Sequence, residues 1–488
     1  MTVSSSTSKV LTIDTINPHV RTMEYAVRGA LPIRAEQLVR ELRNKDNKLP
    51  FDKITFCNIG NPQQLGQKPL TFIRQVTALV EYTDLLKDEN MELTKKMFPE
   101  DAIDRAKNIL GWTNNAIGAY TESLGIHEIR ESVAKFIEER DGFAADADSI
   151  GLTAGASVAV ERILNLIISS SNVGIMIPIP QYPLYTATIA KLDAHAVPYY
   201  LRENKQWGLN AEELKQVLSE HKAKGIDVRA LVVINPGNPT GSLLTKENMV
   251  DIVRFCEENK LVLIADEVYQ ANIYQPERRP FHSFKKIVRE LDSSVELFSL
   301  HSISKGMIGE CGRRGGYYET VNLDKDVSDQ LYKMAAVSLC PNVTGQVAVE
   351  IMVNPPKKGE PSYNLYQQEL NDIYESMRRR SIKLCDAFNA LENITCNSAE
   401  GAMYLFPQIR FPKKAIQAAE ELGKSPEFLY CMGLLESTGV CVVPGGGFHQ
   451  EPGTFHFRST FLPPEDQLDQ FIERIKGFHD SFMDKYRD

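Results

Sequence analysis

Short apolar runs alternate with helical stretches from about residue 111 onward, and this alternation constrains the fold more than any other feature of the chain. Short β-branched runs are typical of buried strands, and the longer stretches between them are typical of helices. The predicted strands are 174–177, 196–201, 230–234, 262–265, 296–300 and 315–319, and the predicted helices between them are 158–169, 184–192, 212–222 and 246–258. This pattern predicts a largely parallel sheet covered by helices, with ligands at the carboxyl ends of the strands.

The segments outside this alternation predict a second, smaller unit, because 488 residues are too many for one typical core. The last part of the chain mixes strands and helices, as an α+β domain does. Its predicted strands are 403–406, 440–443 and 455–458; a helix at 33–43, a strand at 54–59, mostly helix over 70–110, a loop at 355–361 and a long helix after Tyr363 complete the pattern. The basic run 378–380 on that long helix predicts a solvated helix face.

Composition excludes several classes of protein. The formal net charge is −9, whereas nucleic-acid binding needs an excess of basic residues. No apolar run is long enough to span a membrane. The eight cysteines are scattered without a Cys-x-x-Cys pair, which favours reduced thiols over a disulfide framework or a zinc site. The first twenty residues contain few basic residues and no apolar core, so we expect a cytoplasmic protein, with a mitochondrial location as the alternative.

One lysine stands where such a fold would bind a ligand. The segment Ser302-Ile303-Ser304-Lys305-Gly306 follows an apolar run, and Arg313 comes eight positions after the lysine. A lysine is rarely buried without a partner, but in such a place it can hold an aldehyde as a Schiff base. The hydroxyls of Ser302 and Ser304 and the guanidinium of Arg313 indicate a phosphate beside it.

Two small-residue turns offer further ligand contacts, one before a predicted helix and one after a predicted strand. Ala156 and Ser157 precede a helix, whose N-terminal N–H groups and positive dipole suit a phosphate; a serine N-cap is the alternative interpretation. The turn 235–241 (Asn-Pro-Gly-Asn-Pro-Thr-Gly) would present the amide of Asn238 to a ring hydroxyl, or it is simply a rigid turn.

Four further side chains supply complementary chemistry. Asp266 ends a very apolar strand, where a carboxylate is costly unless a cation such as a protonated pyridine meets it. Tyr269 follows three residues later and could reach a phenolic oxygen. Arg458 could hold a carboxylate through two parallel hydrogen bonds, or lie at the surface. Tyr182 could stack on a flat ring, or pack in the core.

Together these groups describe one ligand. It offers an aldehyde to Lys305, a pyridinium to Asp266, a phosphate to hydroxyls and an arginine, and a flat face to an aromatic ring. Pyridoxal 5'-phosphate has all four features, and it is therefore the predicted cofactor.

At this point the chain resembles the fold-type I, class I pyridoxal-phosphate aminotransferases, and among them most closely those that act on alanine. The resemblance covers nearly the whole chain from about Arg21 onward. The closest matches are Glu24-Tyr25-Ala26-Val27-Arg28-Gly29, Asn58-Ile59-Gly60, Gly118-Ala119-Tyr120, residues 177–185, residues 235–241, Gly309-Glu310-Cys311-Gly312, Gly401-Ala402-Met403-Tyr404 and Val443-Pro444-Gly445.

The resemblance implies an α/β fold. A large cofactor-binding domain, residues 91–365, would contain a mostly parallel seven-stranded sheet covered by helices. A smaller α+β domain would be formed by the C-terminal part, 366–488, and an N-terminal arm and segment, 21–90. Residues 1–20 are expected to be disordered.

The resemblance also implies roles. Lys305 would bind the cofactor's aldehyde and then carry the substrate's proton, with Asp266 on the pyridinium. Asn238 and Tyr269 would bond the ring hydroxyl, and Tyr182 would stack on the ring. The phosphate ligands would be Ala156, Ser157, Ser302, Ser304 and Arg313, with Tyr120 reaching the phosphate of a neighbouring subunit in a homodimer. Arg458, with Gly60 beside it, would clamp the substrate's α-carboxylate; no metal is expected.

The implied reaction moves the amino group of L-alanine to 2-oxoglutarate and gives pyruvate and L-glutamate. The partners would therefore be small amino acids and 2-oxo acids, with no nucleic acid and no membrane. Arg28 is a candidate for the distal carboxylate of glutamate. The alternatives are another pyridoxal-phosphate reaction, such as a carbon-sulfur lyase or a transaminase for aromatic or branched substrates, and a non-catalytic protein that binds the cofactor. A dinucleotide enzyme is disfavoured because no Gly-x-Gly-x-x-Gly opens the first strand-helix unit.

Overall fold

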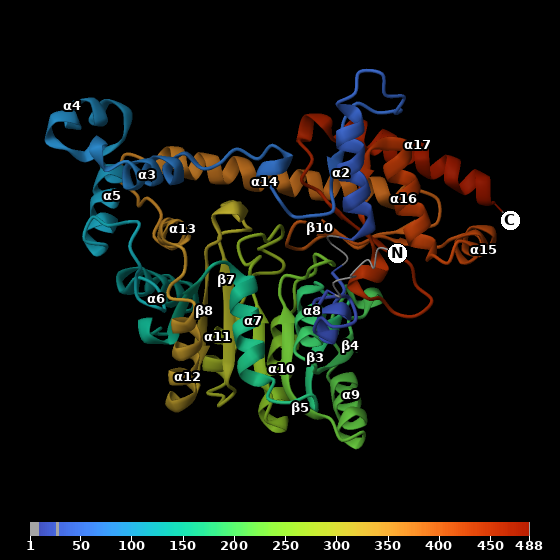
Figure 1. Ribbon diagram of the computed structural model, residues 1–488, viewed down its shortest axis with the longest axis horizontal. Helices are drawn as coiled ribbons and strands as arrows, with labels where there is room; N and C mark the ends of the chain where they lie inside the picture. The colour runs from blue at the N-terminus through green and yellow to red at the C-terminus, as the bar shows by residue number, and fades with distance from the viewer. Residues whose placement is uncertain (1–8, 26–28, 488) are drawn as a thin grey trace, which may run out of the picture.

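A seven-stranded sheet lies at the centre of the larger part of the molecule (Figure 1). The computed structural model describes residues 9–25 and 29–487. In order across the sheet the strands are β2 (Ile150–Thr153), β8 (Gly316–Val321), β7 (Leu297–Ser302), β6 (Val262–Asp266), β5 (Asp227–Ile234), β3 (Val173–Ile179) and β4 (His195–Tyr200). β8 is antiparallel to both of its neighbours, and the other neighbouring pairs are parallel. The predicted mostly parallel sheet is confirmed.

β2 is the strand of this sheet that the sequence pattern did not predict. Its four residues, Ile-Gly-Leu-Thr, make an apolar run too short to stand out from its surroundings. Gly151 is needed at its position, since a Cβ there would collide with the ring of Tyr318 on the neighbouring strand β8. Gly151 therefore weakens the strand pattern in the sequence, but it is the residue that allows β2 to pair with β8.

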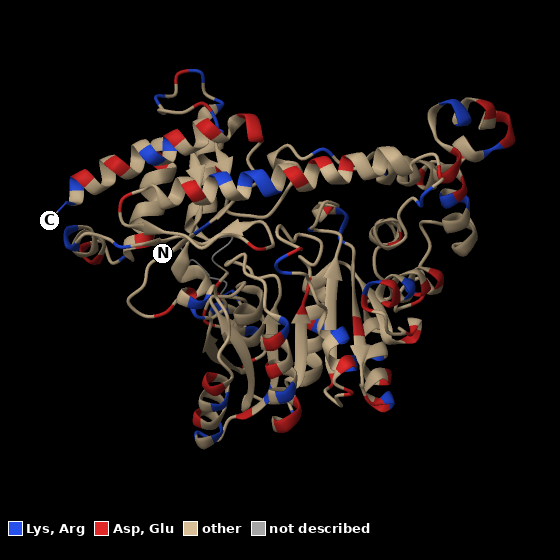
Figure 2. Cartoon of the chain, turned by 180° about the vertical axis from the view of Figure 1, so that it is seen from behind, with Lys and Arg blue, Asp and Glu red and all other residues tan. Residues whose placement is uncertain are grey.

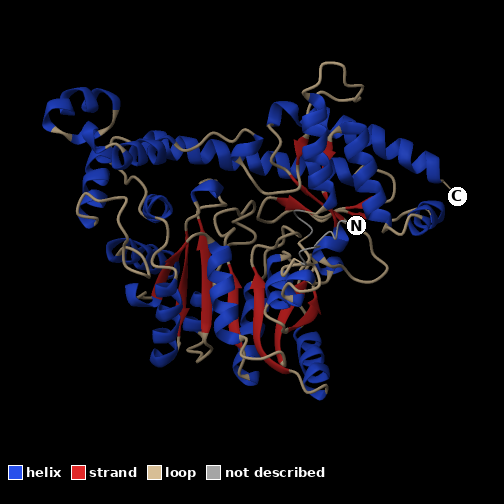
Figure 3. Ribbon diagram, viewed as in Figure 1, coloured by secondary structure: helices blue, strands red, loops and turns tan. Residues whose placement is uncertain are grey.

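The two faces of the sheet are covered by different helices (Figure 3). Successive residues of a strand point to opposite faces. Ala230 and Val232 of β5 join an apolar layer with α7 (Ala156–Ile167) and α8 (Leu184–Lys191). Leu231 and Val233 join the opposite layer, with α9 (Ala211–Ala223), α10 (Lys246–Asn259) and α11 (Phe284–Glu290). Burial on both faces explains why these strands are continuous apolar runs.

The remaining elements are short strands and helices around this sheet. The helices are α1 (Pro18–Arg21), α2 (Ala30–Leu42), α3 (Thr71–Glu81), α4 (Asp88–Met97), α5 (Glu100–Trp112), α6 (His127–Asp141), α12 (Lys325–Val337), α13 (Val343–Val353), α14 (Tyr363–Asn389), α15 (Lys413–Glu421), α16 (Pro426–Thr438) and α17 (Leu468–Tyr486). The strands are β1 (Thr55–Phe56), β9 (Ile394–Thr395), β10 (Tyr404–Leu405), β11 (Gln408–Ile409), β12 (Val440–Cys441), β13 (Val443–Pro444) and β14 (Phe457–Thr460). β14 lies between β10 and β13 in a small antiparallel sheet, and β1 pairs with β12.

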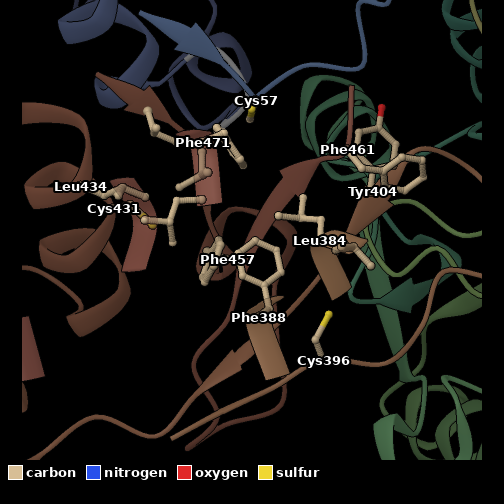
Figure 4. Packing of buried hydrophobic residues seen from close by; sticks show 14 of the residues in the cluster. Cys57, Leu384, Phe388, Cys396, Tyr404, Cys431, Leu434, Phe457, Phe461 and Phe471 are labelled. Atoms are coloured by element: carbon tan, nitrogen blue, oxygen red, sulfur yellow. The ribbon is translucent and has the colours of Figure 1, made fainter. Parts of the chain in front are cut away.

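A second apolar core brings the N-terminal helix α2 together with the C-terminal elements (Figure 4). Phe388 of α14 meets Phe457 of β14 edge to face, with 5.4 Å between ring centroids. Leu434 of α16 and Phe471 of α17 belong to the same core. This core explains why distant parts of the sequence form one small α+β layer.

Helix α14 connects this core to the rest of the molecule, and Figure 1 shows it running from α3 and α5 to α2 and α16. Tyr366, near its start, packs with α3, α5, α6 and α13 in a different apolar cluster. The predicted boundary between 365 and 366 thus falls inside α14, and the predicted boundary between 90 and 91 falls inside α4. Where the chain divides into domains stays a prediction.

The start of the chain and the surface complete the description. Residues 1–8 of the segment predicted to be disordered lie outside the described residues, and 9–17 form mostly exposed turns and bends that lead into α1. Charged side chains are concentrated on the helices, and the strands of the large sheet are mostly free of them (Figure 2).

Within residues 9–25 and 29–487, no helix has both the length and the apolar character that crossing a bilayer requires. That part of the chain also holds no cluster of acidic, histidine or cysteine side chains suited to a metal ion.

Candidate active site

A cavity of about 520 Å³ lies between the carboxyl ends of the large sheet and the small α+β layer. Most of the predicted site residues line it: Gly60, Ala156, Ser157, Tyr182, Asn238, Asp266, Tyr269, Ser302, Ser304, Lys305 and Arg458. Parallel strands that end at one edge of a sheet bring their following loops together, which explains the convergence. Two predicted residues, Arg313 and Tyr120, are not among the lining residues.

Lys305 projects into this cavity from the loop that follows β7. Its Nζ donates to the carbonyl oxygen of Gly60 at 2.6 Å, so the amine meets the N-terminal segment across the cavity. The loop is held in place where the N–H of Gly306 donates to Asn272 Oδ1 at 2.9 Å. Lys305 is half-buried and has no carboxylate partner among the described residues, and an amine in such a place can act as a nucleophile once it is neutral.

Asp266 is the last residue of β6, and only 5% of it is exposed. Its Oδ2 accepts a hydrogen bond from the Tyr185 hydroxyl at 2.9 Å, while Oδ1 has only a long contact, 3.5 Å, with the N–H of Val268. Burial raises the pKa of Asp266 to about 6, against the opposing effects of Tyr185, Val268 and the Lys305 charge. The carboxylate therefore has one oxygen fixed and one available to a cation in the cavity. Tyr185 was missed in the sequence, where nothing distinguished it from a core aromatic.

The N-terminus of α7 forms a cradle for an anion. Gly155, the residue before the helix, has φ +88° and provides no side-chain cap, so the first N–H groups, at Ala156 and Ser157, remain open to a ligand. Arg314 reaches this point: its guanidinium donates to Ser157 Oγ at 3.3 Å and to Ser304 Oγ at 3.4 Å. A Cβ on Gly155 would collide with that guanidinium. Helix dipole, hydroxyls and arginine together match the phosphate of pyridoxal phosphate.

The prediction of Arg313 for this cradle is wrong, and Arg314 takes its place. Arg313 Nε donates to Glu310 Oε2 at 3.2 Å, away from the cavity. Arg314 stands in a left-handed conformation, with φ +55°, between a turn of 3-10 helix and β8. That backbone conformation points the side chains of Arg313 and Arg314 in different directions. Their distance from Lys305 in the sequence could not show which of the two faces the cradle.

Arg458 is a buried cation without an anionic partner. It lies on β14, is 1% exposed, and forms no ion pair with any described residue. Its Nη1 donates to Asn238 Oδ1 at 2.8 Å and its Nη2 to the carbonyl of Asn58, while Nε has no partner in the described part of the chain. Its Cζ lies 4.4 Å from the ring centroid of Tyr404 and 4.5 Å from that of Phe448. Burial lowers the pKa of Arg458, so a carboxylate entering the cavity would relieve an unfavourable charge.

Four tyrosines complete the walls of the cavity. The hydroxyls of Tyr182 and Tyr25 are 2.5 Å apart, and those of Tyr269 and Tyr404 are 2.9 Å apart. Burial acts to raise the pKa of Tyr404, but the charges of Lys305 and Arg458 and the bond with Tyr269 outweigh it and the pKa falls below its usual value. Tyr404 was not predicted as a site residue, although it ends one of the matched motifs.

Tyr120 does not line this cavity. It is 78% exposed on the surface of the chain, so the contacts of this one chain do not connect it to the site. Arg28, the candidate for the distal carboxylate, lies outside the described residues.

Comparison with solved structures supports the fold, and a match to a sequence family defines the class of protein. The chain is similar to an alanine aminotransferase from Pyrococcus furiosus, with a TM-score of 0.74 over 95% of this chain and 99% of that one, at 22% identity. That likeness shows the α/β fold of aminotransferases. The sequence matches the family of class I and II aminotransferases over residues 81–475. The chain belongs to this family.

Relatives of known name lie much closer in sequence. The chain is 52% identical to a probable mitochondrial alanine aminotransferase of Dictyostelium discoideum, over 98% of this chain and 90% of the relative. It is 49% identical to glutamate–glyoxylate aminotransferase 1 of Arabidopsis thaliana, over 98% of each chain. The prediction of an aminotransferase that depends on pyridoxal phosphate is confirmed. The α7 cradle, Asp266 and Lys305 fit that cofactor's phosphate, ring nitrogen and aldehyde.

Proposed function

We propose that this aminotransferase moves the amino group of L-alanine to 2-oxoglutarate and so produces pyruvate and L-glutamate. The observation that carries the proposal is that the amine of Lys305 lines the same cavity as the guanidinium of Arg458, which has no anionic partner among the described residues. The identity to a probable alanine aminotransferase over nearly the whole chain supports alanine as the amino donor.

The cofactor is held by residues from both sides of the cavity. When bound, pyridoxal phosphate supplies an aldehyde that takes up an amino group and a ring nitrogen that draws electrons from the substrate's Cα. Asp266 would keep a proton on that ring nitrogen. Asn238 and Tyr269 would bond the ring hydroxyl, and Tyr182 would stack on the ring. Ala156, Ser157, Ser302 and Ser304 would hold the phosphate with Arg314, in place of the predicted Arg313.

Substrate binding and proton transfer fall to two further side chains. Arg458 binds the α-carboxylate of the amino acid through paired N–H groups, and this orients Cα toward Lys305. Lys305, whose amine projects into the same cavity, would take the proton released from the substrate's Cα and hold it for return during the reaction. General acid–base transfer by a positioned side chain typically accelerates a reaction by about 10²- to 10⁴-fold. Gly60 leaves room for this, since a Cβ there would lie 3.0 Å from Lys305 Nζ.

Replacing Lys305 with alanine tests the central assignment. We expect the Lys305→Ala chain to retain part of its cofactor affinity, because the phosphate and ring contacts remain, but to lose turnover. Steady-state rates with L-alanine and 2-oxoglutarate measure this, and borohydride reduction followed by peptide mapping should label residue 305 only in the unsubstituted chain. Turnover close to the original rate would remove Lys305 from the mechanism.

A second substrate pair has specific support. The similarity to an Arabidopsis glutamate–glyoxylate aminotransferase is almost as high as that to the Dictyostelium protein. Two rates distinguish the pairs: pyruvate formation from L-alanine with 2-oxoglutarate as acceptor, and 2-oxoglutarate formation from L-glutamate with glyoxylate as acceptor. A rate with 2-oxoglutarate well above that with glyoxylate supports the main proposal, and the reverse order supports the alternative.

The assembly and compartment are also proposals. The exposed Tyr120, far from its own chain's cavity lining, supports a homodimer in which it reaches the phosphate bound by the partner. Sedimentation of the holoenzyme tests the dimer, and weaker cofactor retention in Tyr120→Ala tests the contact. We propose a cytoplasmic location from the sequence, while the name of the Dictyostelium relative supports the mitochondrion. Cell fractionation decides between them.

A further inference from the structure

A second tyrosine lies directly behind the cofactor's proposed carboxylate partner. Tyr185 follows Tyr182 by three positions at the start of α8, and its N–H donates to the carbonyl of Tyr182 at 3.4 Å. Tyr182 lines the cavity, whereas Tyr185 is fully buried beneath it. One tight turn thus places one aromatic ring in the cavity and another behind Asp266.

The bond between Tyr185 and Asp266 has a defined direction. Burial raises the pKa of Tyr185 well above its usual value, and the nearby Asp266 charge raises it further. The phenol therefore stays protonated and donates to Asp266 Oδ2 across 2.9 Å. The other groups that face this carboxylate are the N–H of Val268 and, at longer range, the Lys305 ammonium.

The two oxygens of Asp266 are consequently unequal. Oδ2 accepts a hydrogen bond at 2.9 Å from the buried, neutral hydroxyl of Tyr185, whereas Oδ1 has only the 3.5 Å contact with the N–H of Val268. A donor on one oxygen favours the ionised carboxylate and fixes its plane. The less bonded oxygen is then the one that can meet a cationic N–H in the cavity.

We propose that Tyr185 is a positioning residue of the cofactor site: its hydroxyl fixes the plane of the Asp266 carboxylate and keeps it ionised, so that Oδ1 pairs with the protonated ring nitrogen of the cofactor. The inference rests on the proposed function, because it assumes the role of Asp266 there. Tyr185 itself does not touch the ring; it acts through the carboxylate.

The experiment compares cofactor retention by three variants of the holoenzyme. Tyr185→Phe removes the hydroxyl and keeps the ring. Tyr199→Phe is the matched control, since Tyr199 is equally buried and its hydroxyl donates at 2.7 Å to the carbonyl of Val232 rather than to a carboxylate. Asp266→Asn removes the charge. Release of cofactor, followed by absorbance after dilution over a range of pH, gives a dissociation constant at each pH without reference to turnover.

The expected signature is a shift along the pH axis. Without its donor, the Asp266 carboxyl should protonate at higher pH, and a neutral carboxyl cannot pair with the cationic nitrogen. Hydrogen bonds to charged groups are strong enough that Tyr185→Phe should move the midpoint of cofactor loss upward by about one to two pH units. Tyr199→Phe should follow the unsubstituted chain, and Asp266→Asn should bind weakly throughout.

Each other outcome has a definite meaning. If Tyr185→Phe follows the unsubstituted curve while Asp266→Asn loses cofactor, the inference is overturned and the proposed function stands. If Asp266→Asn also retains its cofactor, the proposed role of the carboxylate itself is wrong. Should Tyr185→Phe fold poorly, Tyr185→Met, which also removes the donor, must show the same shift; an unshifted Tyr185→Met curve overturns the inference equally.

Discussion

Replacing Arg458 with methionine separates substrate binding from the rest of the site. The guanidinium is buried, donates to Asn58 and Asn238, and has no anionic partner in the described chain. Methionine fills a similar volume without charge. The substitution removes an unpaired buried cation, which favours the folded state, but it leaves two oxygens without a donor, which opposes it. We therefore expect a chain that folds and retains cofactor.

The expected kinetic loss follows from the bonds that a carboxylate would make. Each hydrogen bond between charged groups contributes about 1.5–3 kcal/mol, so two parallel bonds correspond to roughly 10²- to 10⁴-fold in kcat/KM. L-Alanine and 2-oxoglutarate both carry an α-carboxylate, so Arg458→Met should reduce kcat/KM for both by similar factors. Steady-state kinetics of each half-reaction, with bound cofactor quantified by absorbance, measures this.

Arg380→Met provides the matched control. Arg380 is also a buried arginine near the small layer, 8% exposed, but its Nη1 donates to the carbonyls of Leu462 and Pro463 outside the cavity. Its substitution should change the thermal unfolding midpoint and leave both kcat/KM values unchanged. A loss in Arg458→Met that is below tenfold, or that affects one substrate and spares the other, would refute the assignment of Arg458 to the shared carboxylate.

Four further substitutions, one of them a control, test the rest of the site. Arg314→Gln should weaken cofactor binding by roughly 10- to 100-fold, as expected for lost bonds to a charged group, and Arg313→Gln should not; equal losses in a binding titration would contradict the revised phosphate site. Gly60→Ala places a methyl 3.0 Å from Lys305 Nζ and against the Tyr404 hydroxyl, so turnover should fall sharply; a normal rate would show that the space is not used. Tyr404→Phe keeps the ring beside Arg458 and removes only the hydroxyl, so kcat should fall with little change in KM; a rise in KM alone would contradict this interpretation.

Much of the fold could be predicted because a parallel sheet buried on both faces leaves a strong pattern. The run 230–234 is apolar on both alternating faces, and β5 includes it. The sequence pattern did not predict β2 because the strand is short and contains Gly151. A glycine is needed there because of a contact with Tyr318, and not because of a local conformational preference. Local patterns thus report burial, and they do not report which distant side chain makes a glycine necessary.

The site was predictable to the extent that its residues follow strands. Asp266 comes directly after one apolar run and Lys305 lies in the loop that follows another, and the structure places both in one cavity. The choice of Arg313 over Arg314 failed because adjacent residues differ only in direction, which a left-handed turn decides. The predicted solvated face 378–380 was wrong at Arg380, which is buried against two carbonyls. These errors all concern where a side chain points, and that depends on tertiary contacts.

The two acidic residues at the end of β6 show how the direction of a side chain determines which ligand it can meet. Asp266 and Glu267 are adjacent and both buried, so composition and burial do not distinguish them. Both oxygens of Glu267 are used, one accepting from the N–H of Phe284 at 2.7 Å and the other from the Ser299 hydroxyl at 2.8 Å, and burial raises its pKa to about 7. It is bonded within the protein, on a face that does not line the cavity. Only Asp266 lines the cavity with a weakly bonded oxygen, and for that physical reason it is the member of the pair that can meet a cationic ligand.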